Sequence, residues 1–188
     1  FAGPGPCSIV YCPLAGSGVV HDDDTPPGGI NQPTLTSAFM INPGPYYLAI
    51  SGFNRHPVDG SGQLMWNDDP VNVERAADGP GAAGPVTGWT GFNDSPGEYW
   101  ILLTGCEACD SNIEPDTWSE AVDAPETLPG QVTGGAGVMS NIFGELTNVN
   151  DVDLYCIRIT NPAAFSATTS AAPDNDTQLS LFGSSGTG

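Results

Sequence analysis

Hydrophobic residues along this chain occur in short runs separated by turns rich in glycine, proline, asparagine and aspartate. Residues 152–160 alternate apolar and polar side chains, which is typical of a half-buried strand. Elsewhere, aromatic and aliphatic residues gather in runs that are too short for helices. The pattern therefore predicts an all-β protein with strands near 8–14, 34–41, 46–53, 99–103, 141–146, 152–160, 165–169 and 178–182.

Two of these strands begin in the same way. Asn42-Pro43-Gly44 and Ser95-Pro96-Gly97 each precede one further residue, two aromatic residues and then aliphatic residues. Proline followed by glycine is strong turn chemistry, so both strands are expected to start at a tight turn. Residues 56–86 are predicted to form a long loop, and Trp100 is expected in the core because aliphatic residues follow it.

Charge narrows the range of partners. The 188 residues include 22 acidic side chains, three arginines and no lysine, for a formal net charge of −19. Nucleic acid is excluded as a partner because phosphates would repel such a chain, whereas cations, basic proteins and neutral sugars are compatible. No apolar run reaches the roughly 18 residues of a membrane span. Five cysteines in a small acidic chain favour an oxidising, extracellular location.

The chain resembles the bacterial pre-peptidase C-terminal (PPC) domain at residues 148–155, NVNDVDLY, and 176–182, DTQLSLF. Residues 46–52, YYLAISG, with Asp59, Trp66, Trp89 and 103–105 resemble a long variant of that family. The resemblance implies a jelly-roll-like β-sandwich with long Gly/Pro/Asp-rich loops. It divides the chain into a front part at 1–105, an acidic linker at 106–131 and a back part at 132–188.

The order of these motifs is permuted relative to the family, because the DTQL strand lies at the C-terminus here. One interpretation is a subunit whose terminal strand is exchanged with a neighbour, which would complete the back part and produce a head-to-tail filament. Two other interpretations stay open: a chance similarity of Gly/Ser turns, and a piece of a longer protein.

Acidic loops are the strongest candidate for a site. Carboxylate and amide oxygens on turns are ligands that Ca²⁺ prefers, although none of the loops has the spacing of an EF-hand. Aspartate and asparagine that cap turns in solvent are the alternative. The loops that flank strands expected to be neighbours provide the predicted calcium ligands Asp22, Asp23, Asp24, Asn150, Asp151, Asp153, Asp174 and Asp176.

Other side chains give weaker signals. The disulfide candidates are Cys7, Cys12, Cys106, Cys109 and Cys156, whose pairing the spacing does not fix. His21 and His56 lie beside acidic loops, where either a mixed metal site or an ordinary surface position is compatible with the sequence. Trp66 and Trp118, both placed in loops, are candidate contacts for a glycan or a neighbouring subunit.

No catalytic residues are predicted, because no serine has the Gly-x-Ser-x-Gly context of a nucleophile. The sequence instead favours an extracellular, non-enzymatic structural subunit that polymerises with copies of itself and is stabilised by calcium and disulfides. The alternative is a monomeric secreted module that binds polysaccharide or mediates adhesion.

Overall fold

The computed structural model describes residues 15–24, 32–39, 42–92, 96–108, 118–119, 138–170 and 176–184. Within these ranges the chain forms strands and two short 3₁₀ helices, which confirms the all-β prediction. No described helix is long and apolar enough to cross a membrane. The strands are β1 (Ala15–Asp22), β2 (Thr34–Leu35), β3 (Gly44–Gly52), β4 (Arg55–Asp59), β5 (Arg75–Ala76), β6 (Val86–Gly91), β7 (Gly97–Thr104), β8 (Cys106–Ala108), β9 (Trp118–Ser119), β10 (Asn141–Leu146), β11 (Val152–Ile159), β12 (Ser166–Thr169) and β13 (Thr177–Ser184), and the 3₁₀ helices are η2 (Ser37–Phe39) and η3 (Pro162–Ala164).

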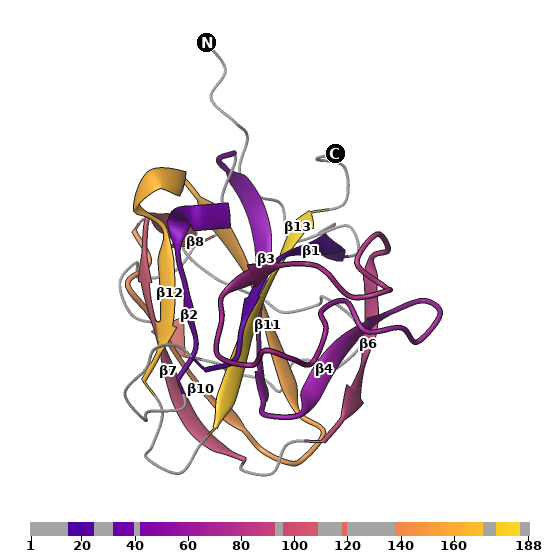
Figure 1. Cartoon of the computed structure of the whole chain (residues 1–188). Coiled ribbons are helices and arrows are strands. Elements are labelled where there is room, and N and C mark those ends of the chain that lie inside the picture. Colours follow the sequence, from indigo (N-terminus) through magenta and orange to yellow (C-terminus); the bar gives the residue numbers. More distant parts are fainter. Residues whose placement is uncertain are drawn as a thin grey trace.

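Two sheets form the body of the molecule (Figure 1). The six-stranded first sheet has the order β5-β1-β13-β3-β11-β8, and its neighbouring strands are antiparallel. The five-stranded second sheet has the order β2-β12-β7-β10-β9, in which only β9 and β10 are parallel. Because β3 pairs with both β11 and β13, the predicted front and back parts contribute strands to the same sheet.

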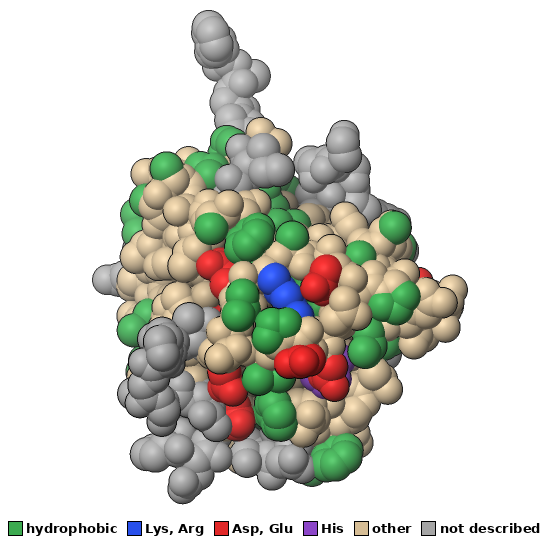
Figure 2. Space-filling view, viewed as in Figure 1, with side chains coloured by type: hydrophobic (Ala, Val, Ile, Leu, Met, Phe, Trp, Pro, Cys, Tyr) green, Lys and Arg blue, Asp and Glu red, His purple; other side chains and the backbone are tan. Residues whose placement is uncertain are grey.

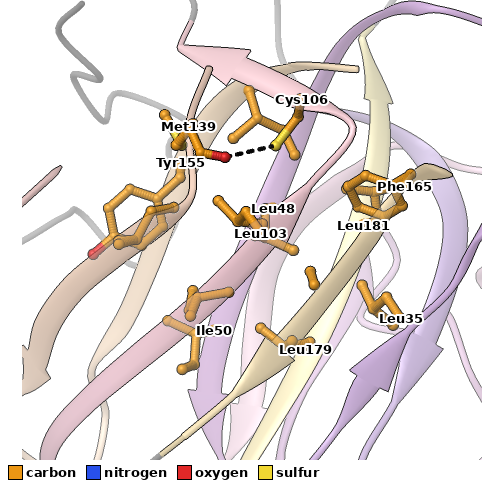
Figure 3. Close-up of a cluster of buried hydrophobic side chains, with 14 of the residues drawn as sticks. Leu35, Leu48, Ile50, Leu103, Cys106, Met139, Tyr155, Phe165, Leu179 and Leu181 are labelled. Carbon is orange, nitrogen blue, oxygen red and sulfur yellow. Dashed lines mark hydrogen bonds between the residues drawn. The ribbon is translucent and has the colours of Figure 1, made fainter. Parts of the chain in front are cut away.

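The main core fills the space between the two sheets. Leu48 and Ile50 of β3 meet Leu179 and Leu181 of β13, and Ile101 packs into the same cluster from the other sheet. Figure 3 shows Leu48, Ile50, Leu179 and Leu181 in one cluster with Leu35 and Phe165. Alternation within β7 explains the packing, because every second residue of that strand is buried.

A second core lies on the opposite face of the first sheet. The segment 53–92, which we call the excursion, contains the small β4–β6 sheet. Met65, Trp66 and Val86 from the excursion pack against Tyr47 and Phe182 of the first sheet. Both faces of β3 are therefore covered, which accounts for the unbroken run of buried residues from position 47 to 52.

Several predicted segments differ from the structure. Within the predicted strand 34–41, the described residues 34–39 form the two-residue β2 and the 3₁₀ helix η2 rather than one long strand. Residues 56–86, expected as a long loop, include most of β4 and the two-residue β5. The predicted linker contains β8 and β9, whereas the predicted strand at 8–14 lies outside the described residues.

Candidate metal centre

Three carboxylates from the two ends of the described chain meet where β1 ends and β13 begins in the first sheet. Asp23 and Asp24 directly follow β1, and Asp176 directly precedes β13. These strands are antiparallel neighbours with Asp22 opposite Leu179, so the end of one lies beside the start of the other. One carboxylate oxygen from each of the three residues lies within 4.8 Å of the other two. This triad of Asp23, Asp24 and Asp176 can hold a metal ion.

Burial makes the triad electrostatically costly without a cation. Asp23 is only 3% exposed, and its Oδ1 atom has no hydrogen-bond partner among the described residues. Burial, followed by the charges of Asp24 and Asp176, raises the pKa of Asp23 to about 8. Burial also raises the pKa of Asp24. A bound cation would offset both the desolvation and the mutual repulsion of these groups.

Backbone hydrogen bonds connect the triad to the excursion. The amide of Asp24 donates to the carbonyl of Val71 over 3.1 Å, and the amide of Phe53 donates to the carbonyl of Asp176 over 3.0 Å. The charge of Asp68, a residue of the excursion, also raises the pKa of Asp23. Figure 2 shows acidic side chains gathered on the face that the excursion helps to form. The triad therefore lies where β1, β13 and the excursion meet.

The two other predicted ligands of this group are Asp22 and Asp174. Asp22 is fully buried, and its Oδ2 atom accepts a hydrogen bond from the amide of Thr34 over 2.6 Å. Asp22 is therefore next to the triad in sequence but serves the β1–β2 junction. Asp174 lies outside the described residues.

The third acidic loop, with the predicted ligands Asn150, Asp151 and Asp153, does not join the triad. This loop precedes β11, and β3 lies between β11 and β13. Two strand spacings, roughly 10 Å, therefore separate β11 from β13. The loops that precede these two strands nevertheless lie at the same end of β3. The prediction placed β11 directly beside the terminal strands, whereas β3 occupies that position.

Each residue of the third loop instead has a structural role. Asn150 is exposed, and its carbonyl accepts a hydrogen bond from Nε of Arg55 over 3.2 Å. Asp151 caps a turn by accepting from the amide and the hydroxyl of Thr147 at 2.5 and 2.8 Å. Asp153 lies in the core, where Oδ2 accepts a 2.5 Å hydrogen bond from the hydroxyl of Tyr99.

Neither histidine belongs to the triad: His56 lies in the excursion, and His21 of β1 packs against it. His56 contacts Asp68 with 2.9 Å between Nε2 and Oδ1. His21 is 5% exposed, and its Nδ1 atom is 2.9 Å from the hydroxyl of Ser180. Burial lowers the pKa of His21 to about 3, so its ring is neutral at physiological pH. His21 is a core residue and not the surface residue that the sequence allowed.

Trp66 and Trp100 have the opposite exposure to that expected. Trp66 is 4% exposed and packs between His21 and Phe182, with ring centroids 5.2 and 5.6 Å away, so its predicted role as a surface contact is wrong. Trp100, expected in the core, is 43% exposed. The backbone of Trp118 forms part of β9, and its side chain lies outside the description.

Cys106 is a free, buried thiol, so the structure contains no disulfide through this residue. Its Sγ atom lies 3.9 Å from the carbonyl oxygen of Met139 (Figure 3). Cys7, Cys12 and Cys109 lie outside the described residues, and for Cys156 only the backbone, in β11, is described. Disulfides among those four residues stay a prediction.

Comparison with protein-family models, curated proteins and solved structures finds no match. The resemblance to the PPC domain therefore stays a prediction. Interpretation of the site depends on the geometry of the chain itself.

Proposed function

We propose that this protein is a calcium-stabilised, extracellular structural module without enzymatic activity. The observation that carries the proposal is the buried Asp23 carboxylate, whose Oδ1 atom has no described hydrogen-bond partner and which shares a site with Asp24 and Asp176. A carboxylate in this setting requires either a proton or a cation. The proposed native partner of the Asp23 carboxylate is a cation.

Calcium suits the ligand set better than other common ions. The three side chains offer only carboxylate oxygens, which are hard ligands, and the triad includes no histidine or cysteine that would favour zinc. Calcium accepts variable coordination geometry and can complete its shell with water or backbone carbonyls. Magnesium demands a near-ideal octahedron at shorter distances, which three loop carboxylates are less suited to provide.

The position of the triad supports a structural role for the ion. Calcium there would link the residues that follow β1 to those that precede β13, and both segments are hydrogen-bonded to the excursion. An ion that binds the folded chain and not the unfolded chain stabilises the fold by mass action. It would also reduce the self-repulsion of a chain with a net charge of −19.

Binding measurements on the metal-free full chain test this proposal. Isothermal titration should give one strong site for Ca²⁺, weaker binding of Mg²⁺ and no preference for Zn²⁺. The Asp176→Asn variant should lose the site. The matched control, Asp69→Asn, removes an exposed carboxylate from the neighbouring excursion and should retain it. Equal weakening in both variants would indicate a diffuse electrostatic effect, and the proposed site would be rejected.

Polymerisation by terminal strand exchange remains a finer proposal. β13 is paired on both sides within its own chain, by β1 and β3. Exchange would have to open the β1–β13 ladder, next to which the triad lies. Electron microscopy of native material with and without a calcium chelator tests this idea. Filaments would support it, and isolated particles under both conditions would contradict it.

A further inference from the structure

The outer face of the second sheet carries an aromatic pair, in which Trp100 is exposed and Phe143 is half-buried. Trp100 of β7 lies directly opposite Phe143 of β10, with ring centroids 4.7 Å apart and ring planes tilted by 51°. Trp100 is 43% exposed, and Leu102, two residues along the same strand, is 48% exposed. These three side chains form an apolar platform on a sheet whose other face covers the main core.

Hydrogen-bonding side chains surround this platform. At one end, exposed Glu98 lies opposite exposed Glu145, and at the other end Asn141 lies opposite Leu102. On the neighbouring strand β12, Ser166 pairs with Thr104, and their hydroxyl oxygens are 2.9 Å apart. Successive rungs on one face are spaced by about 7 Å. The face therefore combines a stacking surface with carboxylate, amide and hydroxyl groups on both sides.

We propose that this face, defined by Trp100, Leu102, Phe143, Glu98, Glu145 and Asn141, binds a neutral polysaccharide. Sugar rings present apolar C–H faces that can stack on aromatic side chains, and equatorial hydroxyls that carboxylates and amides can bind. None of the three arginines lies in the strands of the second sheet, so the face lacks a cation for an anionic glycan. Glu98 and Glu145 would repel such a glycan.

The same charges disfavour other occupants. A second copy docked through this face would bring two pairs of glutamates together, in addition to the repulsion between chains that each carry −19. A basic protein segment would engage the glutamate end, but it would leave the amide and hydroxyl end unused. A neutral glycan can use the whole face.

The full chain can be tested by electrophoresis through gels that contain a soluble polysaccharide. The neutral probes are hydroxyethyl cellulose, xylan and galactomannan. Alginate is the anionic probe, and poly-lysine, used in solution, is the basic one. At least one neutral probe should retard the protein. Trp100→Thr and Phe143→Thr should each weaken that binding by about tenfold or more, as loss of a stacked aromatic contact predicts. Phe92→Ala, which removes an aromatic side chain that is 56% exposed outside this face, should not.

Threonine suits a strand, and circular dichroism of each variant checks that the fold is retained. The Asp176→Asn variant should bind the same glycan, so failure of the calcium site and failure of this face are distinguishable. The proposal is overturned if no neutral probe retards the protein, if Trp100→Thr binds as well as the native chain, or if binding is confined to poly-lysine. Sedimentation showing a dimer that Trp100→Thr dissociates would likewise assign the face to self-association.

Discussion

The indole ring of Trp66 packs directly against the backbone of Gly18. A Cβ atom at position 18 would lie 2.4 Å from Cη2 of Trp66, well inside the van der Waals distance. Trp66 is the largest buried side chain that the excursion contributes to the second core, where it also contacts His21 and Phe182. Gly18 is therefore required for the excursion to dock closely on β1.

Replacement of Gly18 by alanine is expected to destabilise the protein by about 1–3 kcal/mol, because the buried indole must move to accommodate the methyl group. Urea denaturation followed by tryptophan fluorescence measures the change. Gly44→Ala is the matched control, since a Cβ there meets no atom within 4 Å and should change stability by no more than about 0.5 kcal/mol. Equal effects of the two substitutions would contradict the close docking.

The hydroxyl of Tyr99 stabilises a carboxylate inside the main core. Tyr99 donates to the fully buried Asp153 and also contacts the hydroxyl of Tyr155. Tyr99→Phe should cost about 1–3 kcal/mol because a buried acceptor loses a donor. Tyr46→Phe removes a hydroxyl that donates to the Asn42 carbonyl in an exposed setting, and we expect a much smaller change. Chemical denaturation of both variants compares them, and a neutral Tyr99→Phe would refute the role of this hydrogen bond.

The pKa of Asp23 predicts how the metal-free protein responds to pH. Its pKa rises from an ordinary value of 3.8 to about 8 in the folded chain, so the folded state retains a proton that the unfolded state has lost. The contribution of Asp23 to the free energy of unfolding is therefore fully present below pH 3.8 and is lost as the pH rises toward and through 8. His21, with a lowered pKa of about 3, opposes this trend only below about pH 6.5, where the unfolded chain takes up a proton.

Urea midpoints in excess chelator should therefore fall between pH 7 and pH 8.5. Asp23→Asn should remove this dependence, and saturating Ca²⁺ should suppress it because the ion replaces the proton. A native midpoint that stays constant over this interval without metal would show that Asp23 is not the titrating group.

Cys106 is expected to be chemically inert in the folded protein. Burial, aided by the charge of Glu107, raises the pKa of its thiol to about 12, and the thiolate is the reactive form. Iodoacetamide at pH 8 should leave Cys106 unmodified in the native chain and modify it in urea, as peptide mass spectrometry would show. Rapid native labelling, or a Cys106 disulfide in the purified protein, would contradict its position in the core.

The sequence predicted most of the central strands, because β3 and β7 follow turn signals and β11 has an alternating pattern, and both signals depend on local residues. It also brought the loops around residues 22–24 and 174–176 together as neighbours. It could not place β3 between β11 and β13, since strand order depends on long-range pairing, and it therefore did not anticipate that residues 150–153 lie apart from the triad.

The tryptophans show a second limit of sequence reasoning. Alternation in β7 separates Tyr99 and Ile101 from Trp100, but only packing decides which set faces the core. Trp66 is followed by loop-like residues, yet it is buried because the excursion folds over the first sheet. No local pattern around residue 66 indicates that the excursion packs over the first sheet and buries this side chain.

Thermal unfolding in excess calcium and in excess chelator measures whether calcium stabilises the fold. For an ion at about 100 times its dissociation constant, the native chain should gain roughly 2.7 kcal/mol, or about 5–10 °C in midpoint. Asp69→Asn should show the same gain, and Asp176→Asn should show none. An identical midpoint of the native chain in calcium and chelator would contradict a calcium-stabilised fold.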